Sequence, residues 1–331
     1  MSFEGATKLI HQVCTLAGST SLLDDIRAQT RESGISTAIT RHDSAAIFDW
    51  LMTSFSYQGI SDRVARSYLA KHGNIRWADI EASLRQAQPC SKLTNYWSYG
   101  ECRYDKGSST CSQPEHIADC AVPQHKLRNG RLNQTAYSFF LFVRDIAEGD
   151  LVGWIDERLR EPRNAHGRTE AESAMERQER LLGPLRNVYG VSDKILTMSL
   201  SGLLIGAPNS HQNWRETGFG MIAIDSLVHN FLHRTGILHG CGKPHNYGPA
   251  CYATGGCASI VRDASAQIDA ASFNSGFPAN FPRFVQHAIW RFCAADGLDI
   301  CNGNRIDDRK SCENRYCQLG RKCQKWPLKP Q

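Results

Sequence analysis

Residues 185–234, LRNVYGVSDKILTMSLSGLLIGAPNSHQNWRETGFGMIAIDSLVHNFLHR, contain two predicted helix starts, and each carries an ionisable side chain. Gly190 suits a tight turn, because glycine adopts backbone conformations that other residues avoid. Ser192 is a suitable cap for the first helix, whose first turn holds Lys194, and apolar residues then recur at helical spacing. Further on, Asp225 stands just ahead of a second amphipathic run. The stretch therefore predicts two helices, one opened by an amine and one by a carboxylate.

An amine and a carboxylate delivered by separate helix starts can form a catalytic pair. Lys194 could attack an electrophilic sugar carbon and form a Schiff base, while Asp225 stabilises positive charge or handles protons. The simpler interpretation makes Lys194 a solvated lysine of the first turn and Asp225 an N-cap, which is a common role for a carboxylate. The residue types alone leave both interpretations open.

The order of these motifs resembles that of the helix-hairpin-helix DNA glycosylases of the endonuclease III type. Residues 190–194, GVSDK, resemble the hairpin of that family, and residues 224–229, IDSLVH, resemble the segment that holds its essential aspartate. By position, the resemblance implies that Lys194 attacks C1′ of the target nucleotide and that Asp225 is the catalytic carboxylate.

The same resemblance implies further DNA contacts and includes two departures from the family pattern. The hairpin backbone, with Gly190 and Ser192, would bind a phosphate beside the lesion. Gln58 corresponds to a glutamine that enters the space left by the flipped nucleotide, and a loop glutamine bonded to backbone is the alternative. Ser192 replaces the second glycine of the hairpin pattern, and about a dozen extra residues at 207–219 lengthen the interval between the lysine and the aspartate.

Four cysteines near the C-terminus form a second signal. The family commonly ends in a four-cysteine loop that holds a [4Fe–4S] cluster; here the last interval matches and the first two are longer. The resemblance implies such a cluster, with zinc as the alternative. Basic residues crowd the same loop and predict contacts with DNA phosphates, whereas a solvated basic tail is the simpler interpretation. The cysteines are Cys301, Cys312, Cys317 and Cys323, and the basic residues include Arg309, Lys310, Arg315 and Arg321.

Two further cysteine-rich segments lie outside the family pattern. The turn-rich segment 88–125 predicts a four-thiolate zinc site, with unrelated free thiols as the alternative. The glycine- and proline-rich segment 239–257 predicts irregular structure and a possible further metal site. The candidate ligands are Cys90, Cys102, Cys111 and Cys120 in the first segment, and Cys241, His245, Cys251 and Cys257 in the second.

Composition limits the classes of protein that the chain could belong to. With 331 residues it can bury the core of one large domain or two lobes. Its net charge of +5 permits a nucleic-acid partner without requiring one. No apolar run approaches the roughly 18 residues of a membrane span, and the N-terminus lacks the pattern of a signal peptide. These features predict a cytoplasmic protein, associated with the nucleoid if bacterial, in which 13 cysteines bind metal rather than form disulfides.

The resemblance therefore implies an all-α, two-lobed glycosylase fold with cysteine-rich insertions. We expect residues 1–45 and 265–331 to form one lobe with the terminal cysteine loop, and residues 46–264 to form the other around the hairpin. The implied function is a monomeric DNA glycosylase, acting on double-stranded DNA, with AP-lyase activity by β-elimination. The alternatives are a monofunctional glycosylase that uses water activated by Asp225, a non-catalytic metal-stabilised DNA-binding protein, and a structural metalloprotein without a DNA function.

Overall fold

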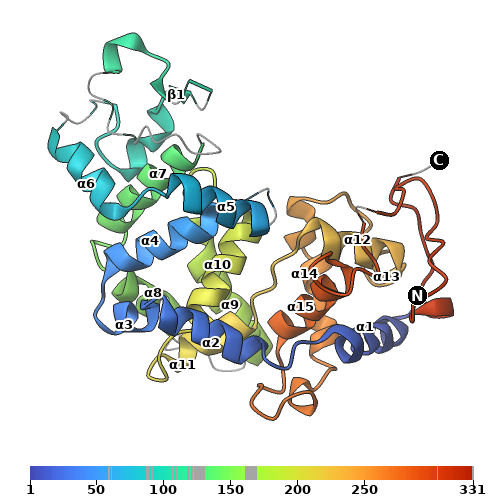
Figure 1. The fold of residues 1–331 in the computed structure, drawn as a ribbon. Coiled ribbons are helices and arrows are strands. Elements are labelled where there is room, and N and C mark those ends of the chain that lie inside the picture. The colour runs from blue at the N-terminus through green and yellow to red at the C-terminus, as the bar shows by residue number, and fades with distance from the viewer. Residues whose placement is uncertain are drawn as a thin grey trace. The chain divides into compact units, whose positions relative to one another are not determined.

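The computed structural model is predominantly helical (Figure 1). Helices make up 59% of it, and the two strands of the described part contain two residues each, which confirms the expected all-α class. In the part of the chain that the structure describes, no helix has both the length and the apolar character needed to cross a bilayer. The structure describes residues 1–58, 60, 62–86, 90, 92–105, 107–108, 110–117, 120, 122, 131–160, 170–303 and 305–329.

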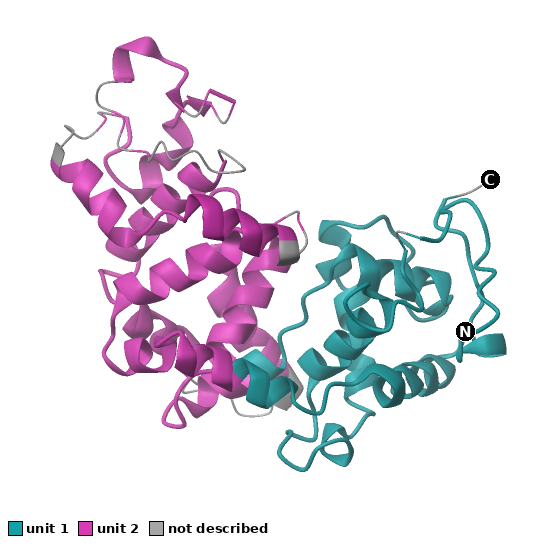
Figure 2. Cartoon of the chain, in the orientation of Figure 1, with its two compact units in different colours: residues 1–26, 218–331 teal, residues 27–217 magenta. Residues whose placement is uncertain are grey.

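The chain divides into two compact units (Figure 2). Unit 1 combines residues 1–26 with 218–331, and unit 2 is residues 27–217. The sequence predicts lobe boundaries near positions 45 and 264. In the structure, residues 27–45 belong to unit 2 instead and residues 218–264 belong to unit 1.

Buried hydrogen bonds explain why the segment after residue 26 belongs to unit 2. The hydroxyl groups of Thr30 and Ser36 donate to the carbonyl oxygen of Gly206, at 3.4 and 3.1 Å. A side chain at position 206 would collide with Thr30, since an added Cβ would lie 2.3 Å from its hydroxyl oxygen. Because buried polar groups are costly to leave unpaired, these bonds hold the segment against unit 2.

Unit 2 contains the predicted hairpin and the first cysteine-rich segment. The described residues of that segment form 3₁₀ turns and two short antiparallel strands, in which Tyr104 pairs with Cys111. Helices α2 (Leu22–Glu32) and α11 (Gln212–Phe219) extend across the boundaries of the two units. The other elements are α3 (Ile35–Thr40), α4 (Ser44–Phe55), α5 (Asp62–His72), α6 (Trp77–Gln86), η1 (Tyr96–Glu101), β1 (Tyr104–Asp105), β2 (Thr110–Cys111), η2 (Pro114–His116), α7 (Arg131–Asp145), α8 (Leu151–Leu159), α9 (Glu170–Leu185) and α10 (Asp193–Ile205).

The core of unit 2 is centred on α4, which contacts α3, α6, α7 and α10. Aromatic rings fill this core. Phe48 of α4 stacks on Phe139 of α7 with ring centroids 5.2 Å apart, and it meets the edge of Trp77 at 5.4 Å. Large buried rings contribute strongly to stability, so α4 and α7 form a rigid base for the helices around them.

Unit 1 joins the N-terminal helix to the C-terminal third of the chain. The apolar face of the first helix is buried, with Leu9, Ile10 and Val13 fully inaccessible. The elements are α1 (Phe3–Ala17), α12 (Ser226–Arg234), α13 (Ile237–Cys241), η3 (Pro249–Tyr252), α14 (Cys257–Ser265), η4 (Ala270–Ser272), α15 (Pro282–Cys293) and η5 (Gly320–Lys322).

Helix α15 is the centre of unit 1, and it contacts α1, α12 and α14. Phe231 of α12 meets the edge of Phe292 of α15, with ring centroids 6.0 Å apart. These contacts place residues 218–264 in unit 1, since α12 and α14 bury their apolar faces against α15. The packing also holds the start of α12, where Asp225 lies, on the core of this unit.

Candidate active site and metal centre

The predicted hairpin is present in unit 2 as a turn between α9 and α10. Gly190 in this turn has φ = +82°, in the left-handed region that favours glycine. The backbone N–H of Tyr189 donates to the hydroxyl of Ser138 at 3.0 Å, which ties the turn to α7. Ser192 is the N-cap of α10, as predicted, but its side chain makes no capping hydrogen bond to the described backbone.

Gln58 lies against this turn and bonds to its backbone at two points. Its side-chain Nε2 donates to the carbonyl oxygen of Gly190 at 3.0 Å, and the N–H of Ser192 donates to its Oε1 at 3.2 Å. This is the backbone-bonded arrangement that the sequence left open as an alternative for Gln58. It also occupies the N–H of Ser192, so that group is free to bind a phosphate only after Gln58 has moved away.

The conformation of the turn gives a direct prediction for Gly190→Ala. An added Cβ would lie 2.6 Å from the Oγ1 of Thr135, and the positive φ disfavours any side chain. We expect a loss of stability on the order of 1–3 kcal/mol, measured by urea unfolding. Gly183→Ala in α9 is the matched control, because the nearest heavy atom to its Cβ is 3.4 Å away, on a flexible glutamate. Equal effects of the two changes would contradict a special role for the turn.

Lys194 and Asp225 belong to different units, Lys194 to unit 2 and Asp225 to unit 1. Lys194 is the second residue of α10 and is half-buried. Within the described residues its ammonium group forms no ion pair, whereas the nearby Asp193 is bonded to Arg186 at 2.8 Å. An amine that is half-buried and not engaged by a carboxylate is suited to act as a nucleophile.

Asp225 is the N-cap of α12, and its carboxylate accepts a hydrogen bond from the N–H of Val228 at 2.9 Å. It therefore has the capping role that the simpler interpretation gave it, a role compatible with chemistry at its other oxygen. The N–H of Ile224 donates to the hydroxyl of Tyr252 at 3.0 Å. This bond anchors Ile224, the residue that directly precedes Asp225. Asp225 is half-buried, so its environment is only partly open to solvent.

Two charged or polar groups share the surroundings of Asp225. Burial lowers the pKa of the Arg283 guanidinium to about 10, and the negative charge of Asp225 partly opposes this shift. Burial raises the pKa of Tyr247, and the charge of Asp225 raises it further. The carboxylate is thus close enough to a buried cation and a phenol for its charge to be felt by both.

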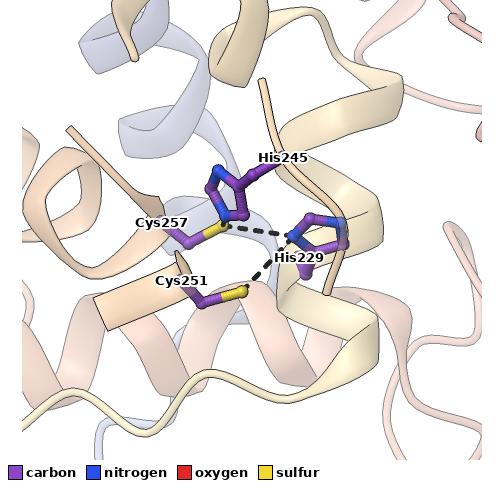
Figure 3. A group of neighbouring side chains, drawn as sticks. All are labelled: His229, His245, Cys251 and Cys257. Atoms are coloured by element: carbon purple, nitrogen blue, oxygen red, sulfur yellow. Dashed lines mark hydrogen bonds between the residues drawn. The ribbon is translucent and has the colours of Figure 1, made fainter. Parts of the chain in front are cut away.

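Unit 1 contains a compact group of four potential metal ligands (Figure 3). His229 comes from α12, His245 from the segment after α13, Cys251 from η3 and Cys257 from the start of α14. Each side chain offers one ligand atom, and all four atoms lie within 4.8 Å of one another. The Nδ1 of His229 is 3.3 Å from the Sγ of Cys257 and 3.5 Å from the Sγ of Cys251.

These distances match a tetrahedral zinc site. With Zn–S bonds near 2.3 Å and Zn–N bonds near 2.0 Å, a nitrogen and a sulfur ligand are about 3.5 Å apart. The Nε2 of His245 is likewise 3.5 Å from the Sγ of Cys257. The other ring nitrogen of His245 lies 2.6 Å from the carbonyl oxygen of Lys243, a partner that fixes the ring and leaves Nε2 for the metal.

The two thiols of this group behave as a strongly interacting pair. The side-chain hydrogen bond with Cys257 lowers the pKa of Cys251 to about 4, and a bond with His229 acts in the same direction. The same interaction raises the pKa of Cys257. A bound metal would displace the protons of both thiols, because cysteine binds metal as the thiolate.

This group contains three of the four residues that the sequence predicts for the segment, His245, Cys251 and Cys257. Cys241 lies outside it, since it closes α13 and its thiol lies 3.8 Å from the carbonyl oxygen of Met1. His229 from α12 is the fourth member. The signal available in the sequence was a histidine on the apolar face of a predicted helix, next to a Cys/His-rich segment. In the structure that histidine, His229, is only 4% exposed.

The four C-terminal cysteines, Cys301, Cys312, Cys317 and Cys323, line one cavity together with Arg234. Burial raises the pKa of Cys323 to about 11, and the charges of the other three thiols raise it further. The side chain of Arg234 is 1% exposed, and its Nε and Nη1 have no hydrogen-bond partner among the described residues. Its Nη2 donates to the carboxylate of Asp308 at 3.2 Å and to the carbonyl oxygen of Ile306 at 3.3 Å, so this buried cation has an anionic partner beside the cavity.

The predicted DNA-contacting residues of the C-terminal loop are all exposed in the structure. Lys310 lies 4.0 Å from Asp307, which is a weak contact between exposed groups. The other members of the set form no ion pair with the described residues. They are Arg309, Arg315 and Arg321.

The four cysteines of segment 88–125 also line a single cavity. The sequence left open whether they are unrelated thiols, and the structure brings Cys111 of β2 together with three cysteines from the turns and loops around it. The lining includes Cys90, Cys102, Cys111, Cys120 and His116.

Comparison with known proteins supplies no relative for this chain. No family model, no curated protein and no solved structure matches it.

Proposed function

We propose that this protein is a helix-hairpin-helix DNA glycosylase that flips a damaged or modified base out of duplex DNA and cleaves its N-glycosidic bond. The observation that carries the proposal is the hairpin. A left-handed glycine, Gly190, joins two helices, and Lys194 stands in the first turn of the second one. Asp225 at the start of α12 supplies the carboxylate that this chemistry needs.

The proposed reaction starts with extrusion of the target nucleotide, which costs a few kcal/mol of stacking and pairing. The amine of Lys194 then attacks C1′ and displaces the base, while the charge of Asp225 stabilises the cationic sugar in the transition state. The base takes up a proton as it leaves. Opening of the sugar ring and loss of the amine proton form a Schiff base between Lys194 and C1′.

The lyase step follows from the Schiff base. Removal of a proton from C2′ and departure of the 3′ phosphate by β-elimination break the strand, and water then releases the sugar and restores Lys194. Double-stranded DNA is the partner, and the exposed cations Arg309, Lys310, Arg315 and Arg321 contact its phosphates.

Two metal groups complete the proposal, and both fit the residues present. The C-terminal cysteines would hold a [4Fe–4S] cluster, because all four thiols line one cavity and four cysteine thiolates are the usual ligands of such a cluster. The cluster supplies a fixed anchor for the basic loop. Zinc fits the His229 group, whose closed set of two nitrogens and two sulfurs is typical of a structural site.

Trapping with borohydride tests this proposal. Duplexes that each carry one deaminated, oxidised or alkylated base are incubated with the full chain, and borohydride reduces any Schiff base to a stable adduct. For a substrate that is processed, we expect Lys194→Gln to lower the adduct yield by at least about 10²-fold, because the nucleophile is lost. Lys71→Gln, at an exposed position of α5, is the matched control and should leave the yield unchanged.

The other outcomes discriminate between the alternatives. Base release without any adduct would assign the protein to the monofunctional class, in which Asp225 activates water. Salt-dependent duplex binding without base release from any substrate would indicate a DNA-binding module. If the protein neither binds duplex DNA nor releases a base, a function on DNA is rejected.

A further inference from the structure

The cysteine-rich segment of unit 2 contains a built site that the proposed glycosylase reaction does not use. Its four thiols, from Cys90, Cys102, Cys111 and Cys120, converge on one cavity although they are eight or more residues apart in sequence. Burial raises the pKa of Cys120, and the charges of the other three thiols raise it further. All four sulfurs are therefore within electrostatic range of one another.

Three of these sulfurs accept hydrogen bonds from backbone N–H groups two residues further along the chain. Tyr104 donates to Cys102, Gln113 donates to Cys111 at 3.5 Å, and Val122 donates to Cys120. Such bonds stabilise sulfur as a thiolate and are among the groups that tune metal–sulfur centres. Free thiols buried for packing alone would not require this repeated arrangement.

The C-terminal loop has the same pattern. There, Leu319 donates to Cys317 and Lys325 donates to Cys323, again across two residues. Cations line each cavity, although Glu101 also lines the cavity of unit 2 and Arg234 is paired with Asp308. The cations are Lys92 and Arg103 in the segment of unit 2, and Arg234 and Lys325 in the C-terminal loop.

The spacing of the sulfurs argues against one zinc ion. Around a single zinc, tetrahedral geometry with Zn–S bonds near 2.3 Å places sulfurs about 3.8 Å apart. The His229 group meets this requirement, with its ligand atoms within 4.8 Å of one another. Among the described residues, three sulfurs that all lie within 4.8 Å of one another are found neither in the cysteine set of segment 88–125 nor in that of the C-terminal loop. A cluster accommodates wider spacing, because its thiolates bind different iron atoms.

We propose that Cys90, Cys102, Cys111 and Cys120 bind a second iron–sulfur cluster, in place of the zinc ion that the sequence predicts. Among the described residues of the segment, the buried apolar ones are Leu93, Tyr99, Tyr104 and Val122, and the cluster would supply the fixed point around which the turns are ordered. The assignment does not depend on the glycosylase reaction.

Metal analysis of the full chain, purified without oxygen, tests the assignment. We expect about eight iron atoms and about eight acid-labile sulfides per chain, as two four-iron clusters require, together with one zinc. Cys102→Ser combined with Cys111→Ser should halve the iron and the sulfide together. The reciprocal double variant, Cys312→Ser with Cys317→Ser, should also halve the iron and the sulfide. It removes the C-terminal cluster and leaves the cluster bound by Cys90, Cys102, Cys111 and Cys120 in place.

The wild-type protein alone can overturn the proposal, even if a variant does not fold. About four iron atoms with two zinc ions per wild-type chain would leave no iron for a second cluster and would assign zinc to this segment. Iron and sulfide that stay unchanged in a folded double variant would show that these cysteines bind no cluster. Absence of base release would not affect either conclusion, because the metal content is measured independently of activity.

Discussion

Asp225→Asn should lower the rate of base release on the order of 10²–10⁴-fold while leaving the fold and DNA binding intact. Asparagine is as good an N-cap as aspartate, so its side-chain oxygen can still accept the hydrogen bond from Val228. What the substitution removes is the negative charge, which the proposed mechanism needs beside the cationic sugar. Single-turnover base release, measured on a substrate identified in the trapping experiment, gives the rate.

A second capping aspartate of unit 1 provides the control for this prediction. Asp269 caps η4 and accepts from the N–H of Ala271 at 3.0 Å. Asp269→Asn makes the same chemical change away from α12 and should leave base release unchanged. Full activity of the Asp225 variant would reject a catalytic role for this carboxylate, and the capping role would then be its only one.

Removal of one metal ligand should have the largest effect on stability. Cys257→Ser deprives the His229 group of a buried sulfur ligand, and we expect the zinc content to fall from about one ion per chain to none. Structural zinc contributes roughly 10 kcal/mol of folding free energy in small domains. The segment that supplies His245 and Cys251 should therefore become accessible to proteases, with cleavage sites mapped by mass spectrometry.

The loss of metal should also slow base release. Tyr252 follows the ligand Cys251 directly, and its hydroxyl accepts the N–H of Ile224, the residue before Asp225. Release of this loop removes that anchor from the start of α12. We expect the catalytic rate constant to fall in parallel with the zinc content, because the carboxylate is no longer held in one position.

Cys241→Ser is the matched control for the metal site, since Cys241 lies in the same segment but outside the ligand group. This variant should keep its zinc, its resistance to proteases and its activity. If Cys241→Ser lost the metal and Cys257→Ser retained it, the assignment of the four ligands would be wrong.

Sequence patterns predicted the local features of this protein well. The capping position of Ser192 and the start of α12 at Asp225 were both evident, because caps and helical periodicity depend on residues only a few positions apart. Glycine at position 190 was equally informative, since a left-handed turn conformation is a local property of the backbone.

Gln58 shows where such local reasoning stops. Its assignment to DNA came from order along the chain, whereas its two hydrogen bonds are made to Gly190 and Ser192, more than 130 positions away. The unit boundaries differed for the same reason, because the contact of Thr30 with Gly206 joins distant segments. No periodicity or spacing encodes such contacts.

Sequence by itself determined the helix starts that hold Lys194 and Asp225 and the segments rich in metal ligands, because short-range spacing is sufficient for these, whereas the all-α class was implied by the family resemblance. Only the tertiary structure decided which side chains meet. It replaced Cys241 by His229 and gathered two sets of four cysteines around separate cavities. The physical reason is that a metal site needs ligand atoms within a few ångströms in space, and packing of helices and loops sets that distance, whatever the interval along the chain.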